Sequence, residues 1–109
     1  MAIPHAASGQ LINIQPLEDK LPEARTVALF KSDELEVMRL IVPAGKTVPS
    51  HQVKGEITVQ CLEGEVAFTA GGQTQVMKAG QLLWLAGGVP HGLTAVRDAS
   101  LLVTLHLCK

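Results

Sequence analysis

Turn-forming residues divide this chain into apolar segments that are too short for ordinary helices. Turn signals fall at residues 43–45, 70–73, 78–80 and 87–90, and the pair Glu63-Gly64 suits a tight hairpin that needs positive φ. The segments between these signals hold four to nine residues rich in Leu, Val and Ile. About ten short strands bounded by turns predict an all-β sandwich or barrel.

The expected strands cover most of the chain. We predict them at residues 11–14, 26–30, 35–42, 57–62, 65–70, 74–77, 82–85, 91–96 and 100–107, with a turn at Arg97-Asp98 between the last two. One segment, residues 15–24, resembles a helix but contains Pro16 and Pro22. Because proline interrupts helices, we expect a turn or a short helical bend there. The length of the chain indicates a single domain.

The composition is apolar and nearly neutral, which excludes several classes of protein. Of the 109 residues, 47% are hydrophobic and 3% are aromatic, and the net charge is -1. An apolar chain of low net charge is not expected to be disordered. We expect no nucleic-acid partner, because the charges balance and the few aromatic residues offer no stacking platform.

The hydropathy predicts a subunit interface. Mean hydropathy is +0.26, which is high for a small monomer. In the strand expected at residues 100–107, Leu101, Val103 and Leu105 share one face and Leu102 lies on the other, so both faces are mostly apolar. A strand of this kind is covered on both sides. We therefore expect a homodimer, with one face of this strand in the barrel and the other against a second copy.

The ends of the chain and its cysteines favour the cytoplasm. The N-terminal residues lack the basic and apolar regions of a secretory signal, and no apolar run reaches the ~20 residues of a membrane-spanning helix. Cys61 and Cys108 lie far apart in the sequence and are expected to be reduced, each as a small buried hydrophobic side chain. We expect a cytoplasmic protein with no membrane partner.

Two histidines stand in segments that resemble the motifs of the cupin superfamily. Gly45 and His51, followed by Leu62-Glu63-Gly64, look like the first motif, which carries G, H-x-H, E and G in that order. The segment 80–91, which begins with Gly and ends with His91, resembles the second motif of G, P-x-G, H and N. Ala86 and Ala95 stand where that motif has Pro and Asn.

The resemblance covers about residues 35–107 and is specific for the fold, because both motifs occur in order and at the expected spacing. It implies a small RmlC-like cupin: a double-stranded β-helix, or jelly-roll barrel, of short antiparallel strands, commonly a homodimer. Residues 35–109 would form the barrel. Residues 1–34 would add strands and a turn to the barrel edge or to the dimer interface.

The resemblance also implies a metal position that this chain fills only in part. Cupin metal sites use three His and one carboxylate to bind one divalent Fe, Mn, Ni, Zn or Cu ion. His51 and His91 match two of these ligands, whereas Val53 and Ile57 occupy the other two positions. Two imidazoles alone seldom hold a divalent ion, so the site is degenerate and no cofactor is certain.

Two further residues could complete a metal site. Glu56 lies one position from the carboxylate position and would turn inward if Lys54-Gly55 formed a bulge. His106 would join the cavity if its face of the final strand pointed into the barrel.

We expect a small organic molecule, largely apolar or aromatic and with one polar group, to bind at His51, His91, Val53, Ile57 and Glu56. No catalytic residue is assigned. A metal-dependent oxygenase or isomerase with His51 and His91 as ligands remains an alternative. A metal-free epimerase or isomerase with His as a general base is a third, although the chain has no Tyr to assist it.

Overall fold

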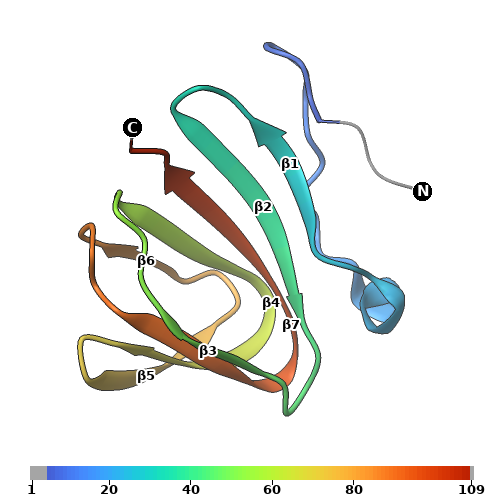
Figure 1. The fold of residues 1–109 in the computed structure, drawn as a ribbon. Coiled ribbons are helices and arrows are strands. Elements are labelled where there is room, and N and C mark those ends of the chain that lie inside the picture. The colour runs from blue at the N-terminus through green and yellow to red at the C-terminus, as the bar shows by residue number, and fades with distance from the viewer. Residues whose placement is uncertain (1–4, 109) are drawn as a thin grey trace.

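The computed structural model describes residues 5–108, which form one short 3-10 helix and seven strands (Figure 1). The helix is η1 (Glu18–Glu23). The strands are β1 (Val27–Lys31), β2 (Leu35–Val42), β3 (Thr47–His51), β4 (Ile57–Ala70), β5 (Gln73–Lys78), β6 (Leu82–Leu85) and β7 (His91–His106). All pairings between them are antiparallel. The protein therefore has the expected all-β jelly-roll fold.

Two long strands, β4 and β7, hold the barrel together because each runs through both of its layers. They pair along their whole length, from Ile57 opposite Leu105 to Ala70 opposite His91. The halves that contain Ile57 and Leu105 belong to the layer β1-β2-β7-β4-β6. The other halves belong to the layer β3-β7-β4-β5. Figure 1 shows both long strands curving from one layer into the other.

The hairpin predicted at Glu63-Gly64 is wrong. Gly64 does have a positive φ of 87°, but it lies inside β4, where the pairing with β7 shifts register between Cys61 and Val66. A Cβ at Gly64 would overlap the backbone oxygen of Asp98 in β7. Glycine is needed here because two bent strands approach each other closely, not because the chain reverses.

The turn predicted at Arg97-Asp98 is wrong for the same reason, since both residues lie within β7. The strands predicted at 57–62 and 65–70 are therefore one strand, β4, and those predicted at 91–96 and 100–107 are one strand, β7. The strands predicted at 35–42 and 82–85 are confirmed with their boundaries, and η1 confirms the short helical bend within 15–24. Residues 11–14 form no strand, and β3 was not among the segments predicted from the sequence.

The core lies between the two layers and is filled by alternate side chains of the strands. Its buried members are aliphatic apart from one phenylalanine, one methionine and one cysteine: Val42, Ile57, Val59, Cys61, Val66, Phe68, Met77, Leu93, Ala95, Ala99, Leu101 and Val103. Alternation explains the selection, since side chains on a strand point to opposite faces in turn. Ile57, Val59 and Cys61 in β4 follow this period.

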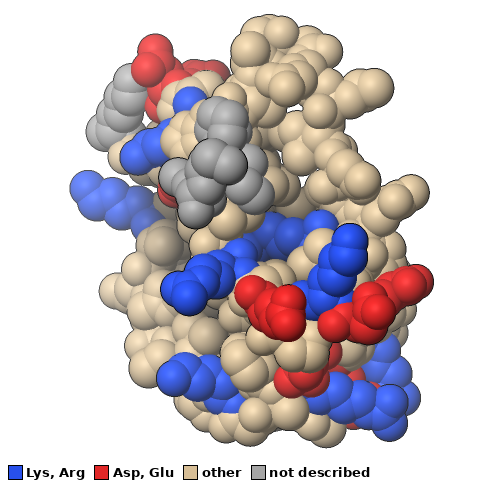
Figure 2. Space-filling view, turned by 90° about the vertical axis from the view of Figure 1, so that its right-hand side faces the viewer, with Lys and Arg blue, Asp and Glu red and all other residues tan. Residues whose placement is uncertain are grey.

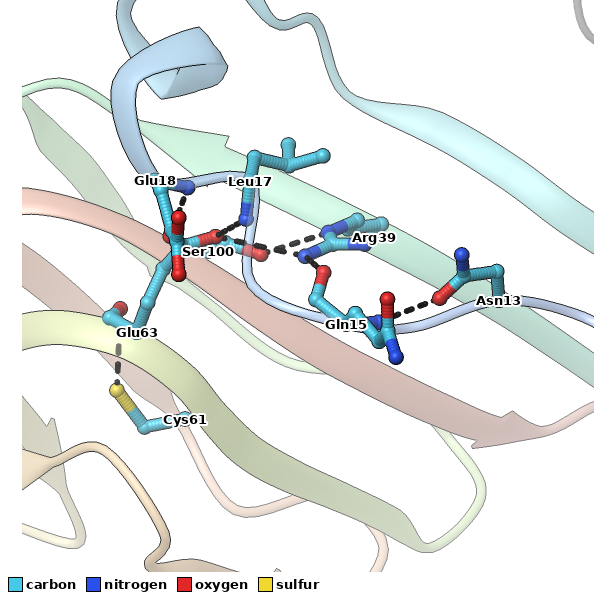
Figure 3. Close-up of polar contacts among 8 residues, drawn as sticks. All are labelled: Asn13, Gln15, Leu17, Glu18, Arg39, Cys61, Glu63 and Ser100. Atoms are coloured by element: carbon cyan, nitrogen blue, oxygen red, sulfur yellow. Dashed lines mark hydrogen bonds and ion pairs between the residues drawn. The ribbon is translucent and has the colours of Figure 1, made fainter.

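The outer face of the first layer is tied to the N-terminal segment through Arg39 (Figure 3). Arg39 is 6% exposed, and its Nε donates to Ser100 Oγ at 2.8 Å. Its Nη2 donates to the backbone oxygen of Gln15 at 2.6 Å and lies 3.4 Å from Glu63 Oε2. We call these four residues the N-terminal clasp. A buried guanidinium needs such partners, because an unpaired charge away from water is costly.

The surface carries charges of both signs. On the face shown in Figure 2, Lys and Arg side chains lie across the middle of the surface, with Asp and Glu side chains beside them. Within residues 5–108, no helix has the length and apolar character needed to cross a membrane.

Candidate ligand-binding cavity

A cavity of about 210 Å³ lies inside the barrel. Of the described residues that line it, His51 and His91 are the ones with polar side chains, and none is Asp, Glu, Lys or Arg. The lining residues come from both layers: Met38, Leu40, Val48, His51, Val53, Ile57, Val59, Phe68, His91, Gly92, Leu93, Leu101, Val103 and Leu105. The wall is therefore apolar, with one polar spot.

An irregularity in β3 brings His51 to the cavity. Val48 also lines the cavity. His51 comes three positions later, and regular alternation would place the two side chains on opposite faces. The pairing of β3 with β7 shifts register between Val48 and His51, so that His51 lies opposite His91. The extra residue of a β-bulge changes the face on which the next side chain lies.

His91 is the first residue of β7 and is only 5% exposed. Its ring centroid lies 4.4 Å from that of His51, and the two planes are inclined by 56°. The ring of Phe68 stands parallel to that of His91, with 5° between the planes and 6.1 Å between the centroids. Phe68 thus packs on His91 and limits the orientations that its ring can take.

Both imidazoles contact a backbone oxygen through Nδ1. His51 Nδ1 lies 3.1 Å from the carbonyl oxygen of Pro49, and His91 Nδ1 lies 2.9 Å from that of Val89. A carbonyl oxygen only accepts hydrogen bonds, so each Nδ1 must donate. In the neutral imidazole, Nε2 is then the acceptor nitrogen.

Two loops at the histidine end of the barrel are joined through their backbones. One loop, residues 52–56, follows β3, and the other, residues 86–90, precedes β7. The N–H of Gly88 donates to the oxygen of Val53 at 2.8 Å. A Cβ at Gly87 would overlap the backbone oxygen of Lys54, so the loops can approach this closely because residue 87 has no side chain.

The side chains at the family's remaining ligand positions, Val53 and Ile57, line the cavity beside the histidines. Neither can bind a metal ion. Within the described part of the chain, no three His, Cys, Asp or Glu side chains lie close enough together to hold one. The residues present therefore do not fit the three-His, one-carboxylate group that the family implies.

The sequence left open that Glu56 turns into the cavity, but in the structure its side chain points away from the cavity. Its Oε1 accepts a hydrogen bond of 2.8 Å from Trp84 Nε1, and Trp84 is 61% exposed. Ile57 opens β4 facing inward, so its neighbour Glu56 faces outward. No bulge at Lys54-Gly55 reverses that facing.

His106 also lies away from the histidine pair. It is exposed, and its Nδ1 is 3.9 Å from Cys108 Sγ in a shallow depression beside the turn between β1 and β2. Leu105 lines the cavity, so the next residue of β7 points outward.

The cysteines are both free. Cys61 is fully buried, as expected, whereas the expectation that Cys108 is buried is wrong. Burial raises the pKa of the Cys61 thiol above its ordinary value, and the nearby Glu63 carboxylate adds to this effect. A hydrogen bond with the backbone of Glu63 opposes it.

The sequence did not single out Phe68 as a cavity residue. It was expected to pack in the core or at an interface, and it does lie in the core cluster, but its ring also faces His91. Alternation along β4 places Phe68 on the inward face together with Val66 and Ala70. Its position near His91 depends on the register in which β4 pairs with β7, which the sequence does not show.

Fold and cavity together define a small jelly-roll barrel that encloses a space of ligand size. A family model described as Cupin domain matches residues 38–107, and the chain therefore belongs to the cupin family. No curated protein matches it.

Solved structures agree with this assignment. A cupin superfamily protein from Desulfitobacterium hafniense is 20% identical, with a TM-score of 0.78 over 94% of this chain and 100% of the other. An RmlC-like cupin from Desulfovibrio desulfuricans is 28% identical, with a TM-score of 0.68 over 94% and 97%. A predicted oxalate decarboxylase from Thermotoga maritima is 23% identical, with a TM-score of 0.69 over 76% and 79%.

Proposed function

We propose that this small cupin binds one small organic molecule inside the barrel, with an apolar body in the cavity and one polar group at His51 and His91. The observation that carries the proposal is the composition of the wall. Among the fourteen lining residues in the described part of the chain, twelve have no polar side-chain atom able to form a strong hydrogen bond, and the other two are these histidines. An apolar pocket with a few convergent polar groups is typical of small-molecule sites.

The size of the cavity supports a ligand with one ring. Its volume is about 210 Å³. An engineered apolar cavity of about 150 Å³ in another protein takes up benzene. The additional space would accommodate a substituent that reaches the histidines.

The alternative activity, a metal-dependent oxygenase or isomerase, finds less support. Relatives in fold include a predicted oxalate decarboxylase and a salicylate 1,2-dioxygenase, but at 23% and 19% identity they support the fold alone. His51 and His91 are two donors, and catalytic metal sites usually have three protein ligands or more.

Titration calorimetry with toluene tests the proposal. We expect toluene to bind to the wild-type protein and to bind at least about tenfold more weakly to Val59→Phe and to Val48→Phe, which each place a ring in the cavity. Val59 is buried and Val48 is half-buried, so the second variant still reports if the first fails to fold. Val76→Phe on the exposed side of β5 is the control and should bind toluene normally. Equal binding to all four proteins, or no binding to any, would overturn the proposal.

The cytoplasmic location is also a proposal. Its support is that Cys61 and Cys108 are both free thiols, as expected in a reducing compartment.

A further inference from the structure

We propose that the cavity selects neutral molecules that carry a hydrogen-bond donor, such as a phenol or an aromatic amine, over acids and over molecules with acceptors only. This inference rests on the proposed function and names the class of ligand for the same site.

The direction of the histidine hydrogen bonds sets the selectivity. Both Nδ1 atoms are committed to carbonyl oxygens, those of Pro49 and Val89. The ring nitrogen that remains for a ligand is Nε2, which in the neutral ring has a lone pair and no proton. A hydroxyl or amino group can donate to it, whereas an ether or a carboxylate offers only another lone pair.

The Nε2 atom of His91 is accessible despite the burial of its residue. Among the described residues, no fully buried side-chain nitrogen or oxygen lacks a hydrogen-bond partner. His91 is 5% exposed, and its only hydrogen bond in the described part of the chain is the one made by Nδ1. Its Nε2 must therefore reach open space, and the residue lines the cavity.

Among the described residues, the wall offers an anion no Lys or Arg side chain, although His51 at its edge is exposed to solvent. Moving a carboxylate from water into an apolar space without a cationic partner is far more costly than moving a hydroxyl that finds a hydrogen-bond acceptor. The cavity should therefore exclude acids whose ring would otherwise fit.

Aromatic surfaces favour a ring near the histidines. Phe68 and His91 stand parallel, and the tilted ring of His51 lies beside them. A planar ligand can pack against these rings in an offset or edge-to-face arrangement. Phenol combines such a ring with a hydrogen-bond donor. It is benzene with one small substituent, and this cavity of about 210 Å³ is larger than the cavity of about 150 Å³ that takes up benzene.

The test compares five probes of similar size by titration calorimetry at about pH 8, where imidazoles in general are neutral. The probes are phenol, aniline, toluene, anisole and benzoate. We expect phenol and aniline to bind about five- to tenfold more tightly than toluene, the gain of one hydrogen bond. Anisole should bind no better than toluene, and benzoate at least about tenfold more weakly.

A double variant, His51→Phe/His91→Phe, should still bind toluene but lose the preference for phenol. His106→Phe changes a histidine outside the cavity and should keep the preference. The inference is overturned if benzoate or anisole binds the wild type as tightly as phenol, or if the double variant keeps the full preference. If the double variant does not fold, the ranking of the five probes on the wild type decides alone. Failure of the proposed function gives a different result, since neither toluene nor phenol would then bind.

Discussion

The carboxylate of Glu63 accepts a hydrogen bond of 2.8 Å from the backbone N–H of Leu17, which lies 46 positions earlier in the chain. Its second oxygen accepts another of 3.0 Å from the N–H of Glu18. Glu18 has a positive φ of 54°, which is unfavourable for a residue with a side chain. A side chain of β4 thus satisfies the backbone at the start of η1 and holds this N-terminal segment beside Arg39.

Removing the Glu63 carboxylate should destabilise the protein. Glu63→Ala leaves Arg39 buried without its counter-charge and two backbone N–H groups without their acceptor. We expect the free energy of unfolding to fall by about 3 kcal/mol, measured by urea denaturation. Glu63→Gln, which keeps one acceptor oxygen, should cost less. Glu23→Ala, at an exposed position of η1, is the control, and an equal loss in both alanine variants would refute the role of Glu63.

Replacing Gly64 should cost more than replacing a glycine in an open turn. Gly64 and Gly72 have similar positive φ values, 87° and 83°, but a Cβ at Gly72 meets nothing within 4 Å. Gly72→Ala should therefore cost about 1 kcal/mol, the penalty of a left-handed backbone alone. Gly64→Ala adds a collision with the backbone of β7, and we expect a loss above about 3 kcal/mol or no folding. Thermal unfolding of the two variants under the same conditions measures the difference, and equal melting temperatures would contradict the prediction.

Stability should decline at high pH because of Cys61. Its pKa in the folded protein is raised by burial above 9.0, its ordinary value, so the unfolded chain loses the thiol proton first. The unfolded state is then favoured as the pH rises from about 9, while below that pH the thiol contributes no pH dependence. Urea denaturation from neutral pH to pH 10 should show this fall in the wild type and in Cys108→Ser. The fall should be smaller in Cys61→Ala, and an unchanged pH profile in that variant would exclude Cys61 as the cause.

The missing metal ligands can be restored. We expect the wild type, purified without an affinity tag, to hold far less than one transition-metal ion per chain. Val53→His/Ile57→Glu places the family's donors beside His51 and His91 and should raise the content towards one Zn²⁺ per chain after dialysis against zinc. Elemental analysis measures both proteins, and Val53→Thr/Ile57→Thr is the matched control. Stoichiometric metal in the wild type that is lost in His91→Ala would contradict the apolar-cavity proposal.

The homodimer remains a prediction, and register suggests which surface would form it. Leu82 and Trp84 are exposed on β6. Gln60 of β4 lies opposite both Leu82 of β6 and Leu102 of β7. The side chains of these three residues therefore share the outer face of the first layer. Sedimentation at micromolar concentration should give about twice 11.6 kDa. Trp84→Glu should weaken association by tenfold or more, whereas Val76→Glu, exposed on the other layer, should not. A wild-type monomer would refute the prediction.

The local sequence was sufficient to predict strand boundaries at the places where turn-forming residues do form a turn. The boundaries of β2 and β6 follow from the polar or glycine-containing residues on either side of them. The hairpin predicted at Gly64 was wrong because a glycine with positive φ occurs both in hairpin turns and in bends within a strand. Only the opposite strand, with the Asp98 backbone beside Gly64, distinguishes the two.

The sequence predicted the two histidines of the candidate site, but not which way the neighbouring side chains face. Motif spacing indicated His51 and His91, and the structure brings their rings to 4.4 Å. The facing of Glu56 depended on whether a bulge formed at Lys54-Gly55, which composition does not decide. The bulge lies instead before His51, where β3 pairs with β7, so it depends on contacts between distant segments.

The continuous pairing of β4 with β7 also sets the order in which the chain can assemble. Ala70 and His91 are its partners nearest in sequence, and Ile57 and Leu105 are those farthest apart. Closing a shorter loop loses less chain entropy, so pairing is favoured to begin at Ala70 and His91 and to extend towards Leu105. The end of the barrel that carries His91 would then form early, before the layer containing β1 and β2 can close over it.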